Sequence, residues 1–352
     1  MNSFGINYPF WREIPVQPYC RVNKMVTAKK WVLVKQFVGK PKESDFSLEE
    51  ETIPDEVNDG GVLCEALYLS VDPYIRFLSN VMMKPGDTLV GEQIARVIAS
   101  KNPKYAVGEV IRLSSGWRSH TLVTDVTQID TMPELGDLPL SFALGAAGVT
   151  GLTALFGLED KLKPMEGETV LVNSAAGAVG SVVGQLAKMK GCTVIGFAGT
   201  DDKVRWLTEL GFDHAFNYKK VDIDEALSMA APSGVNCYFD NVGGCLSTQM
   251  LQHMHRNARV LIAGSIATYN DIGKSTGPYL FEDILKKCMS VTGFSIYDTY
   301  PKWRDGEAQL ASWIQQGKLQ HRETVTEGFE FMPQAFMGLF EGICTGKALV
   351  KA

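Results

Sequence analysis

The stretch ETVLVNSAAGAVG (residues 168–180) decides the fold. Its first half is an apolar run typical of a buried strand, and its second half is a turn of small residues. Laid on the pattern G-x-G-x-x-G, the turn places Ala175, Gly177 and Gly180 at the three small positions. Apolar residues at helical spacing follow over 180–190. This order predicts a dinucleotide-binding site at the helix N-terminus, and the alternative is a purely structural turn.

The segment after this turn alternates between strands and helices. One of the predicted helices is capped by Thr200 and carries apolar residues on one face. Such alternation indicates an α/β fold in which a doubly wound parallel sheet is covered by helices on both faces. The predicted strands cover residues 168–173, 192–197, 214–217, 235–240, 259–263 and 289–294.

The N-terminal third has short strand-like runs separated by glycine, proline or asparagine. This spacing predicts an irregular β-barrel over about residues 26–125, in which the acidic stretch 43–60 is solvated loop and edge. A C-terminal helix (333–342) and strand (347–351) are expected to return to the barrel. The predicted barrel strands cover residues 30–38, 61–69, 89–99, 109–113 and 119–123.

These patterns divide the chain into three parts. We expect an irregular N-terminal arm (1–25), a barrel domain (26–145 and 318–352) and a Rossmann domain (146–317), with Met25 as an alternative start of the ordered core. The uncharged stretch 138–158 is long enough for a membrane span, but its four glycines and one proline favour a buried, close-packed helix.

The end of the second predicted strand indicates which cofactor is bound. An enzyme that prefers NAD places an acid there to bind the ribose 2′-hydroxyl, whereas this chain has Gly199. Lys203 follows in the next helix, and a cation beside an acid-free strand end suits a 2′-phosphate. We therefore expect NADPH, although Asp201 and Asp202 at the start of that helix oppose this choice.

Composition argues against several other classes of protein. The 352 residues carry 34 lysines and arginines against 40 acids, a net charge of −6, without the basic excess of a nucleic-acid binder. The seven cysteines form no C-x-x-C pair, and the five histidines form no ligand cluster. We expect His253 and His255 on different faces of one helix, and therefore no metal site. No G-x-S-x-G or P-loop sequence supports a hydrolase.

Five strings carry a resemblance to a known family: LSVDPYIR (69–76), VNSAAGAVG (172–180), FNYK (216–219), YFDNVGG (238–244) and GSIATYN (264–270). With them the chain resembles the zinc-free medium-chain dehydrogenase/reductases. Within that family it is most similar to the prostaglandin reductase branch, which includes leukotriene 12-hydroxydehydrogenases and 2-alkenal reductases. The resemblance runs from about Met25 to Ala352. It implies a GroES-like β-barrel domain packed on a Rossmann domain, with NADPH in the cleft between them.

The resemblance also implies which residues bind the cofactor. The turn 177–180 holds the pyrophosphate, Lys203 and Tyr218 face the 2′-phosphate, and Asn241 lies near the nicotinamide half. The loop 263–269 wraps the cofactor, and residues 294–296 approach the nicotinamide. The full implied set is Gly177, Ala178, Val179, Gly180, Lys203, Tyr218, Asn241, Ala263, Gly264, Ser265, Ile266, Ala267, Thr268, Tyr269, Phe294, Ser295, Ile296 and Cys344.

Two positions depart from the family pattern. Relatives place an asparagine where this chain has Cys344, and a tyrosine where it has Lys286. If that tyrosine helps to hold an enolate oxygen, its task moves to Tyr74, Tyr269 or a ribose hydroxyl. We expect Tyr74 and Tyr269 as catalytic hydrogen-bond donors, with ordinary packing as the alternative. The expected substrate contacts are Tyr74, Trp117 and Tyr297, and the alternative for Trp117 is the barrel core.

The resemblance implies NADPH-dependent reduction of the C=C bond of α,β-unsaturated ketones and aldehydes, including 15-oxoprostaglandins and alkenals. Hydride transfer to the β-carbon precedes protonation of the enolate, and no metal takes part. The alternatives are a quinone reductase, dehydrogenation of hydroxy-eicosanoids, and a crystallin-like or RNA-associated protein without turnover. We expect a cytoplasmic homodimer that takes a small enone or lipid aldehyde, without nucleic acid or membrane span.

Overall fold

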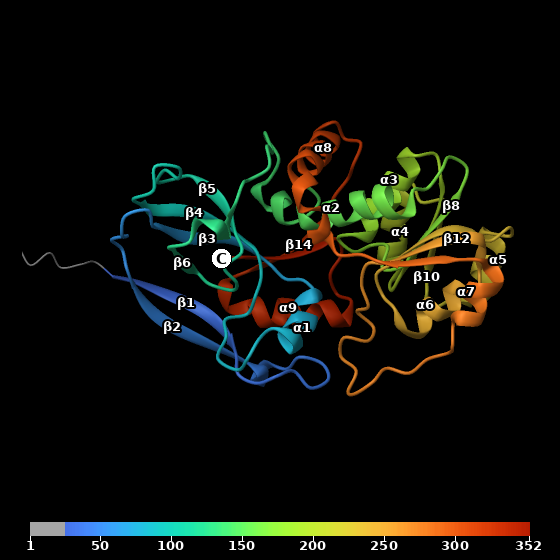
Figure 1. The fold of residues 1–352 in the computed structure, drawn as a ribbon, viewed down its shortest axis with the longest axis horizontal. Helices are drawn as coiled ribbons and strands as arrows, with labels where there is room; N and C mark the ends of the chain where they lie inside the picture. The colour runs from blue at the N-terminus through green and yellow to red at the C-terminus, as the bar shows by residue number, and fades with distance from the viewer. Residues whose placement is uncertain (1–24) are drawn as a thin grey trace, which may run out of the picture.

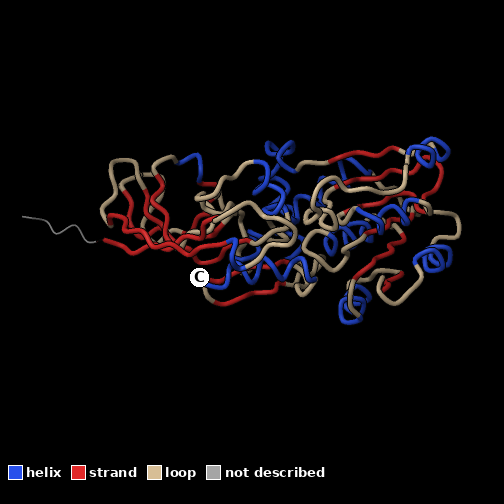
Figure 2. The backbone as a smooth tube through the Cα atoms, turned by 90° about the horizontal axis from the view of Figure 1, so that it is seen from below, coloured by secondary structure: helices blue, strands red, loops and turns tan. Residues whose placement is uncertain are grey.

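The computed structural model describes residues 25–352, which form two sheet-based regions side by side (Figure 1). The β-rich region holds the first described strands and the C-terminus, and the other region is a parallel sheet with flanking helices. Figure 2 shows the strands of the two regions at opposite ends of the molecule. The arm predicted for residues 1–25 lies outside the described residues except for Met25, which begins the first strand.

The β-rich region contains a seven-stranded and a two-stranded sheet. The larger sheet has the order β14-β15-β3-β4-β5-β7, with β6 paired to β3, so the C-terminal strands do return to it. In the smaller sheet β1 and β2 are antiparallel. The strands are β1 (Met25–Leu33), β2 (Phe46–Pro54), β3 (Val62–Ser70), β4 (Gln93–Ser100), β5 (Val110–Leu113), β6 (His120–Val123), β7 (Ile129–Asp130), β14 (Glu323–Glu327) and β15 (Lys347–Lys351).

Two features of this region differ from the sequence-based expectation. The acidic stretch 43–60 contains a strand, β2, rather than mainly loop. Its acids stay near solvent while basic neighbours offset their charge, since Glu51 pairs with both Lys30 and Arg118. In addition, helix α1 (Tyr74–Val81) interrupts the barrel segment and was not predicted.

The six-stranded sheet is parallel throughout, with the order β10-β9-β8-β11-β12-β13. Val170 and Val172 pack on one face with residues of α3 and α4, and Leu171 packs on the other face with residues of α5 and α6. The doubly wound α/β prediction is therefore confirmed. The strands are β8 (Thr169–Val172), β9 (Thr193–Ala198), β10 (His214–Asn217), β11 (Val235–Asp240), β12 (Met254–Ile262) and β13 (Ser290–Gly293).

The remaining described elements are helices. The α-helices after α1 are α2 (Val149–Phe156), α3 (Gly180–Met189), α4 (Asp201–Glu209), α5 (Ile223–Ala230), α6 (Gly244–Leu251), α7 (Phe281–Lys287), α8 (Trp303–Gln315) and α9 (Met332–Glu341). The 3-10 turns are η1 (Glu43–Asp45), η2 (Val126–Gln128), η3 (Leu140–Leu144), η5 (Ile296–Lys302) and η6 (Phe329–Phe331), and η4 (Gly157–Leu162) is a π-helix.

The stretch 138–158 is largely buried, as expected, but it is not one helix. It divides into η3, α2 and the start of η4 because its glycines bring backbone segments too close for side chains. A Cβ on Gly151, for example, would lie 1.9 Å from the Ala146 carbonyl oxygen. Over residues 25–352 there is no helix with the length and apolar character needed to cross a membrane.

The two regions are joined by a buried ion pair. Arg112 on β5 donates from Nη1 to Glu307 on α8 at 2.6 Å, and both side chains are almost fully buried. The same nitrogen lies 3.4 Å from the Ala143 carbonyl oxygen. This pair therefore fixes the β-rich region against the helices of the parallel-sheet region.

Candidate active site

The turn between β8 and α3 is a backbone cradle at the carboxyl edge of the parallel sheet. Ser174 has a left-handed conformation, with φ of 45°, and its carbonyl oxygen accepts from the Gly177 amide at 2.9 Å. A Cβ on Gly180 would lie 2.5 Å from the same oxygen, and one on Gly177 would lie 3.1 Å from it. The helix start and the turn thus leave room for phosphates beside free N–H groups, which fits a dinucleotide.

A buried polar network fixes the sheet edge next to this turn. The Asn173 amide donates to the Tyr238 hydroxyl and to Asp240 Oδ1, each at 2.6 Å. Asn173 Oδ1 accepts from the Asn241 backbone amide at 2.7 Å, and the Asn241 side-chain amide returns a bond to the Asn173 carbonyl at 3.1 Å. Because every one of these bonds joins the end of β8 to β11 or its loop, Asn241 is held in one orientation at the carboxyl edge of the sheet.

The residues expected at the ribose phosphate gather at the end of β9. A Cβ on Gly199 would lie 3.3 Å from the Tyr218 hydroxyl, and Lys219 Nζ lies 5.9 Å from the centre of the Tyr218 ring. Burial lowers the pKa of the Lys203 ammonium. The end of β9 thus has Gly199 in place of an acid, with Tyr218 and the half-buried Lys203 following in the chain. This arrangement fits a ribose that carries a phosphate.

The two aspartates that opposed this choice are engaged elsewhere. Asp201 accepts from the Asn217 amide at 2.7 Å and pairs with Lys220. Asp202 pairs with Arg205 on the same helix. Thr200 caps this helix, as predicted, by accepting from the Lys203 amide at 3.3 Å.

The closing segment of the chain lies against the glycine turn. The Gly346 amide donates to the Ala176 carbonyl at 2.8 Å, and Lys203 Nζ donates to the Gly342 carbonyl at 2.7 Å. Between these two contacts lies Cys344, whose thiol pKa is raised by burial although Lys203 and Lys347 oppose the rise. Cys344 therefore lies beside the cofactor turn, at the position where relatives have an asparagine.

Two further segments border the same edge. The Ala263 amide donates to the Asp240 carbonyl at 2.8 Å, and the Ala267 amide donates to the Val242 carbonyl at 3.0 Å, so the loop 263–269 packs on the segment that contains Asn241. The Phe294 amide donates to the Ile262 carbonyl at 3.2 Å and continues β13 toward Ser295 and Ile296. The expected cofactor residues thus converge on one edge of the sheet.

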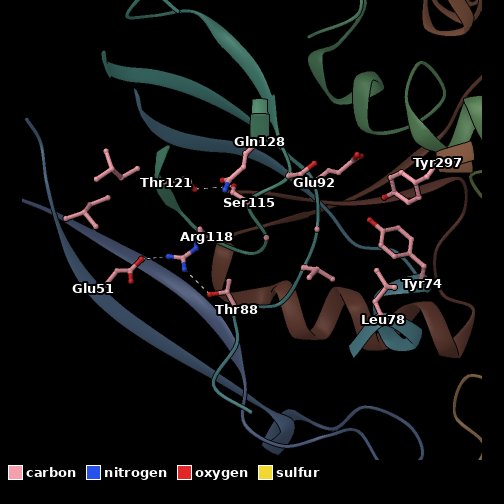
Figure 3. Close-up of a pocket in the computed structure, with 16 residues that line it drawn as sticks. Glu51, Tyr74, Leu78, Thr88, Glu92, Ser115, Arg118, Thr121, Gln128 and Tyr297 are labelled. Atoms are coloured by element: carbon pink, nitrogen blue, oxygen red, sulfur yellow. Dashed lines mark hydrogen bonds and ion pairs between the residues drawn. The ribbon is translucent and has the colours of Figure 1, made fainter. Parts of the chain in front are cut away.

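A cavity of about 560 Å³ lies inside the β-rich region, and Tyr297, which directly follows residues 294–296 of this edge, contributes to its lining (Figure 3). Tyr74 and Tyr297 lie at one end, and Arg118 and Glu51 lie at the other. Its lining residues are Glu51, Ile53, Tyr74, Leu78, Thr88, Val90, Gly91, Glu92, Ser114, Ser115, Gly116, Arg118, Thr121, Leu122, Gln128 and Tyr297.

The two tyrosines at the cleft end are neutral hydrogen-bond donors. In Figure 3 their hydroxyls point into the same space, near Glu92. Burial, followed by the charges of Asp72 and Glu92 and by Tyr297, raises the pKa of Tyr74 well above its usual value. Burial and the same carboxylates raise the pKa of Tyr297 to about 12. Both hydroxyls therefore keep their protons at neutral pH and can donate to an oxyanion.

Two expectations about individual residues need correction. Trp117 is fully buried in the core with Phe46 and Phe336, so it does not form the cavity wall as the substrate assignment required. Its neighbours Gly116 and Arg118 line the cavity instead. His253 and His255 do not share a helix, because β12 begins between them at Met254.

Tyr269 and Lys286 lie away from the cavity wall. The Tyr269 hydroxyl accepts from the Ser265 amide at 3.2 Å, within its own loop, and its ring lies 6.3 Å from that of Phe77. Lys286 is exposed on α7 and pairs with Glu282 at 2.7 Å. Within residues 25–352 no three His, Cys, Asp or Glu side chains form a group suited to a metal ion.

Sequence reasoning missed Glu92 and the buried group around Lys347. Glu92 lines the cavity beside the two tyrosines, and Lys347 donates to Asp72 at 2.6 Å and to Ser70 at 2.7 Å beneath them. One sequence feature could have indicated both residues, namely a charged residue within or at the start of an apolar strand. Glu92 interrupts the predicted strand 89–99, and Lys347 begins the strand 347–351.

The fold and this edge define a medium-chain dehydrogenase/reductase. Residues 29–131 match a family described as the N-terminal domain of oxidoreductase, and residues 178–314 match one described as zinc-binding dehydrogenase. The chain is 48% identical to bovine (Bos taurus) prostaglandin reductase 1, covering 93% of this chain and all of the relative. It is 36% identical to the NADP(+)-dependent 2-alkenal reductase of Nicotiana tabacum, covering 92% and 97%.

A solved structure supports the same assignment. CurA of Vibrio vulnificus in complex with NADPH superimposes with a TM-score of 0.85 and 35% identity, covering 92% of this chain and 99% of that chain. The chain belongs to the prostaglandin reductase branch of the medium-chain dehydrogenase/reductase family.

Proposed function

We propose that this protein is an NADPH-dependent reductase of the C=C bond of α,β-unsaturated ketones and aldehydes. The observation that carries the proposal is the juxtaposition of a dinucleotide turn with a cavity that presents two neutral tyrosine hydroxyls. Relatives named prostaglandin reductase and 2-alkenal reductase, and the NADPH in the CurA complex, support this substrate class and this cofactor.

The pyrophosphate of the cofactor would be held by backbone, and its 2′-phosphate by side chains. The turn 177–180 would bind the pyrophosphate, and Lys203 with Tyr218 would bind the 2′-phosphate. Asn241, the loop 263–269 and residues 294–296 would border the nicotinamide half. When bound, NADPH supplies a hydride to the β-carbon of the enone.

The side chains of the cavity would then stabilise the charge that develops on the substrate oxygen. Tyr74 and Tyr297 are placed at one end of the cavity, from which both hydroxyls can donate hydrogen bonds to it. Tyr269 does not line the cavity, and its hydroxyl accepts from the Ser265 amide, so it is assigned the role of holding its loop.

A substrate panel tests the proposed function. Purified protein is mixed with NADPH or NADH and with a 15-oxoprostaglandin, a 4-hydroxyalkenal, simple enones and quinones. We expect NADPH-dependent loss of the enone ultraviolet band, with a clear preference for NADPH over NADH. Turnover of quinones alone would favour a quinone reductase, and the absence of turnover with every enone would overturn the proposal.

We also propose that two copies associate through the free edge of the parallel sheet. β13 is the edge strand, and its residues are exposed. Exposed apolar side chains lie on α7, which contacts the neighbouring strand β12, and on the segment before it; they include Tyr279, Phe281 and Leu285. An unpaired strand next to such a patch favours pairing with a second copy. Sedimentation should give a dimer for the wild type and a monomer for V291K/L285E, and a monomeric wild type would contradict the proposal.

The remaining assignments concern domains and compartment. We propose the division at residues 26–145 with 318–352 and 146–317, because it separates the two sheets of the β-rich region from the parallel sheet. We propose a cytoplasmic location because Cys64, Cys192 and Cys237 are buried free thiols, as expected in a reducing compartment. Localisation of the tagged full chain by microscopy tests this assignment.

A further inference from the structure

Glu92 is a buried acid that faces the cavity without a partner. Its side chain lies just before β4, is 7% exposed and lines the cavity between the tyrosine end and Gln128. Nearby buried acids are paired, since Asp72 accepts from Lys347 and Glu307 accepts from Arg112. Within residues 25–352 no hydrogen bond or ion pair engages the Glu92 carboxyl. A charged carboxylate in such a place is costly, so the protonated form is favoured.

The charges around Glu92 nearly cancel. Arg112 on β5 and Lys347 on β15 favour its charged form, but Glu307 and Asp72 already neutralise them. Asp72 and Asp130 oppose ionisation, and the hydroxyls of Tyr74 on α1 and Tyr297 on η5 face the same space. Burial, as the largest effect, raises the pKa of Glu92 to about 7. The group can thus give up and regain a proton near neutral pH.

Resting on the proposed function, we propose that Glu92 is the acid that protonates the α-carbon of the substrate after hydride transfer. The Glu92 O–H bond breaks, a C–H bond forms at the α-carbon, and the electron pair of the enolate C=C bond moves into the new bond as the carbonyl reforms. Solvent entering through the polar side of the cavity, near Ser114 and Gln128, then returns a proton to the carboxylate.

The two tyrosines are less suited to this step. Proton transfer is most efficient from an acid whose pKa lies near the working pH, and those of Tyr74 and Tyr297 are raised far above it. They keep their protons and hold the substrate oxygen, whereas Glu92 delivers a proton to the adjacent carbon. The cavity therefore divides the acid and the oxyanion donors between different side chains.

The variant Glu92→Gln tests this division, because it preserves shape and removes the acid. We expect kcat to fall about 100-fold, the size typical of losing a general acid. The decline of wild-type kcat as the pH rises through about 7 should disappear in the variant. Glu92→Asp should restore part of kcat and the pH dependence. Glu49→Gln, an exposed acid on β2, is the matched control and should behave as wild type.

Two readouts separate proton delivery from a structural role. With an α-methyl enone (a 3-methyl-3-alken-2-one), the wild type should form one enantiomer of the ketone, and Glu92→Gln should form a nearly equal mixture because solvent reaches either face. In the protein without cofactor, the infrared carboxyl band that disappears near pH 7 should be missing from Glu92→Gln and present in Glu49→Gln.

The outcomes separate the two proposals. If the wild type reduces no enone, the proposed function fails and the assigned role of Glu92 fails with it. If the wild type reduces enones but Glu92→Gln retains the pH profile and the stereochemistry, only the role of Glu92 is overturned. Loss of the pH profile together with racemic product supports the role.

Discussion

The two sides of the cleft are built in different ways. The cofactor side is one continuous strand, turn and helix, from β8 to α3, and its recognition groups are backbone amides with space left by glycine. The substrate side collects side chains from α1, from the residue before β4 and from η5, which are far apart in the chain. The first side depends on local sequence, and the second depends on how the two regions pack together.

Removing the buried pair between the regions should have the largest effect on stability. Arg112→Met leaves the Glu307 carboxylate buried without its cation, which lowers the free energy of unfolding by about 3–5 kcal/mol. The double variant Arg112→Met/Glu307→Leu should recover most of this loss, because neither charge remains. Urea denaturation measures both. A single variant within about 1 kcal/mol of wild type would show that the substrate side does not depend on this pair.

The second-largest effect is expected in the pH dependence of the free energy of unfolding, which depends on Glu92 on the substrate side. The pKa of Glu92 is about 7 in the fold and about 4.5 in the unfolded chain, so folding takes up a proton between these values. The stabilising contribution is therefore complete below about pH 4.5 and is lost as the pH rises through about 7. Above that, the wild type buries a charge at a cost of about 3 kcal/mol.

Glu92→Gln removes this cost. Thermal and urea unfolding at several pH values should show the variant more stable than wild type above pH 7, with a difference that shrinks on acidification. The control Glu49→Gln should follow the wild-type curve. A difference between variant and wild type that stays constant with pH would mean that Glu92 is already ionised in the fold.

On the cofactor side, Gly180→Ala tests the backbone cradle. The new Cβ would lie 2.5 Å from the Ser174 carbonyl oxygen and 2.8 Å from the Ala175 Cα, both of which are backbone atoms. We expect a loss of about 2 kcal/mol in stability and a tenfold or greater rise in the Kd for NADPH, measured by fluorescence titration. Gly277→Ala has no atom within 4 Å and is the control. Unchanged NADPH binding would contradict the cradle.

This contrast also explains how far the sequence predicts the structure. The turn, the cap at Thr200 and the parallel strands follow from local pattern and match the structure closely, except that β12 begins at Met254, five residues before the predicted start at 259. The substrate side was less predictable: Trp117 was expected at the cavity but is buried behind it, and Glu92 was overlooked. Neither position follows from spacing along the chain, because each depends on which neighbours from distant strands fill the space around it.

The smallest effect is expected at Lys203, where the two sides meet. Its ammonium donates to the Gly342 carbonyl and is also the cation proposed to bind the 2′-phosphate, so two roles need separation. Lys203→Ala should raise the Kd for NADPH about tenfold, or about 1.4 kcal/mol, and leave the Kd for NADH unchanged. Lys190→Ala, which breaks an exposed pair with Glu159, serves as the control. An equal loss for both cofactors would mean that Lys203 acts by holding the closing segment against the glycine turn. Cofactor binding would then also depend on how segments distant in the chain pack together. The cofactor side would in that respect resemble the substrate side.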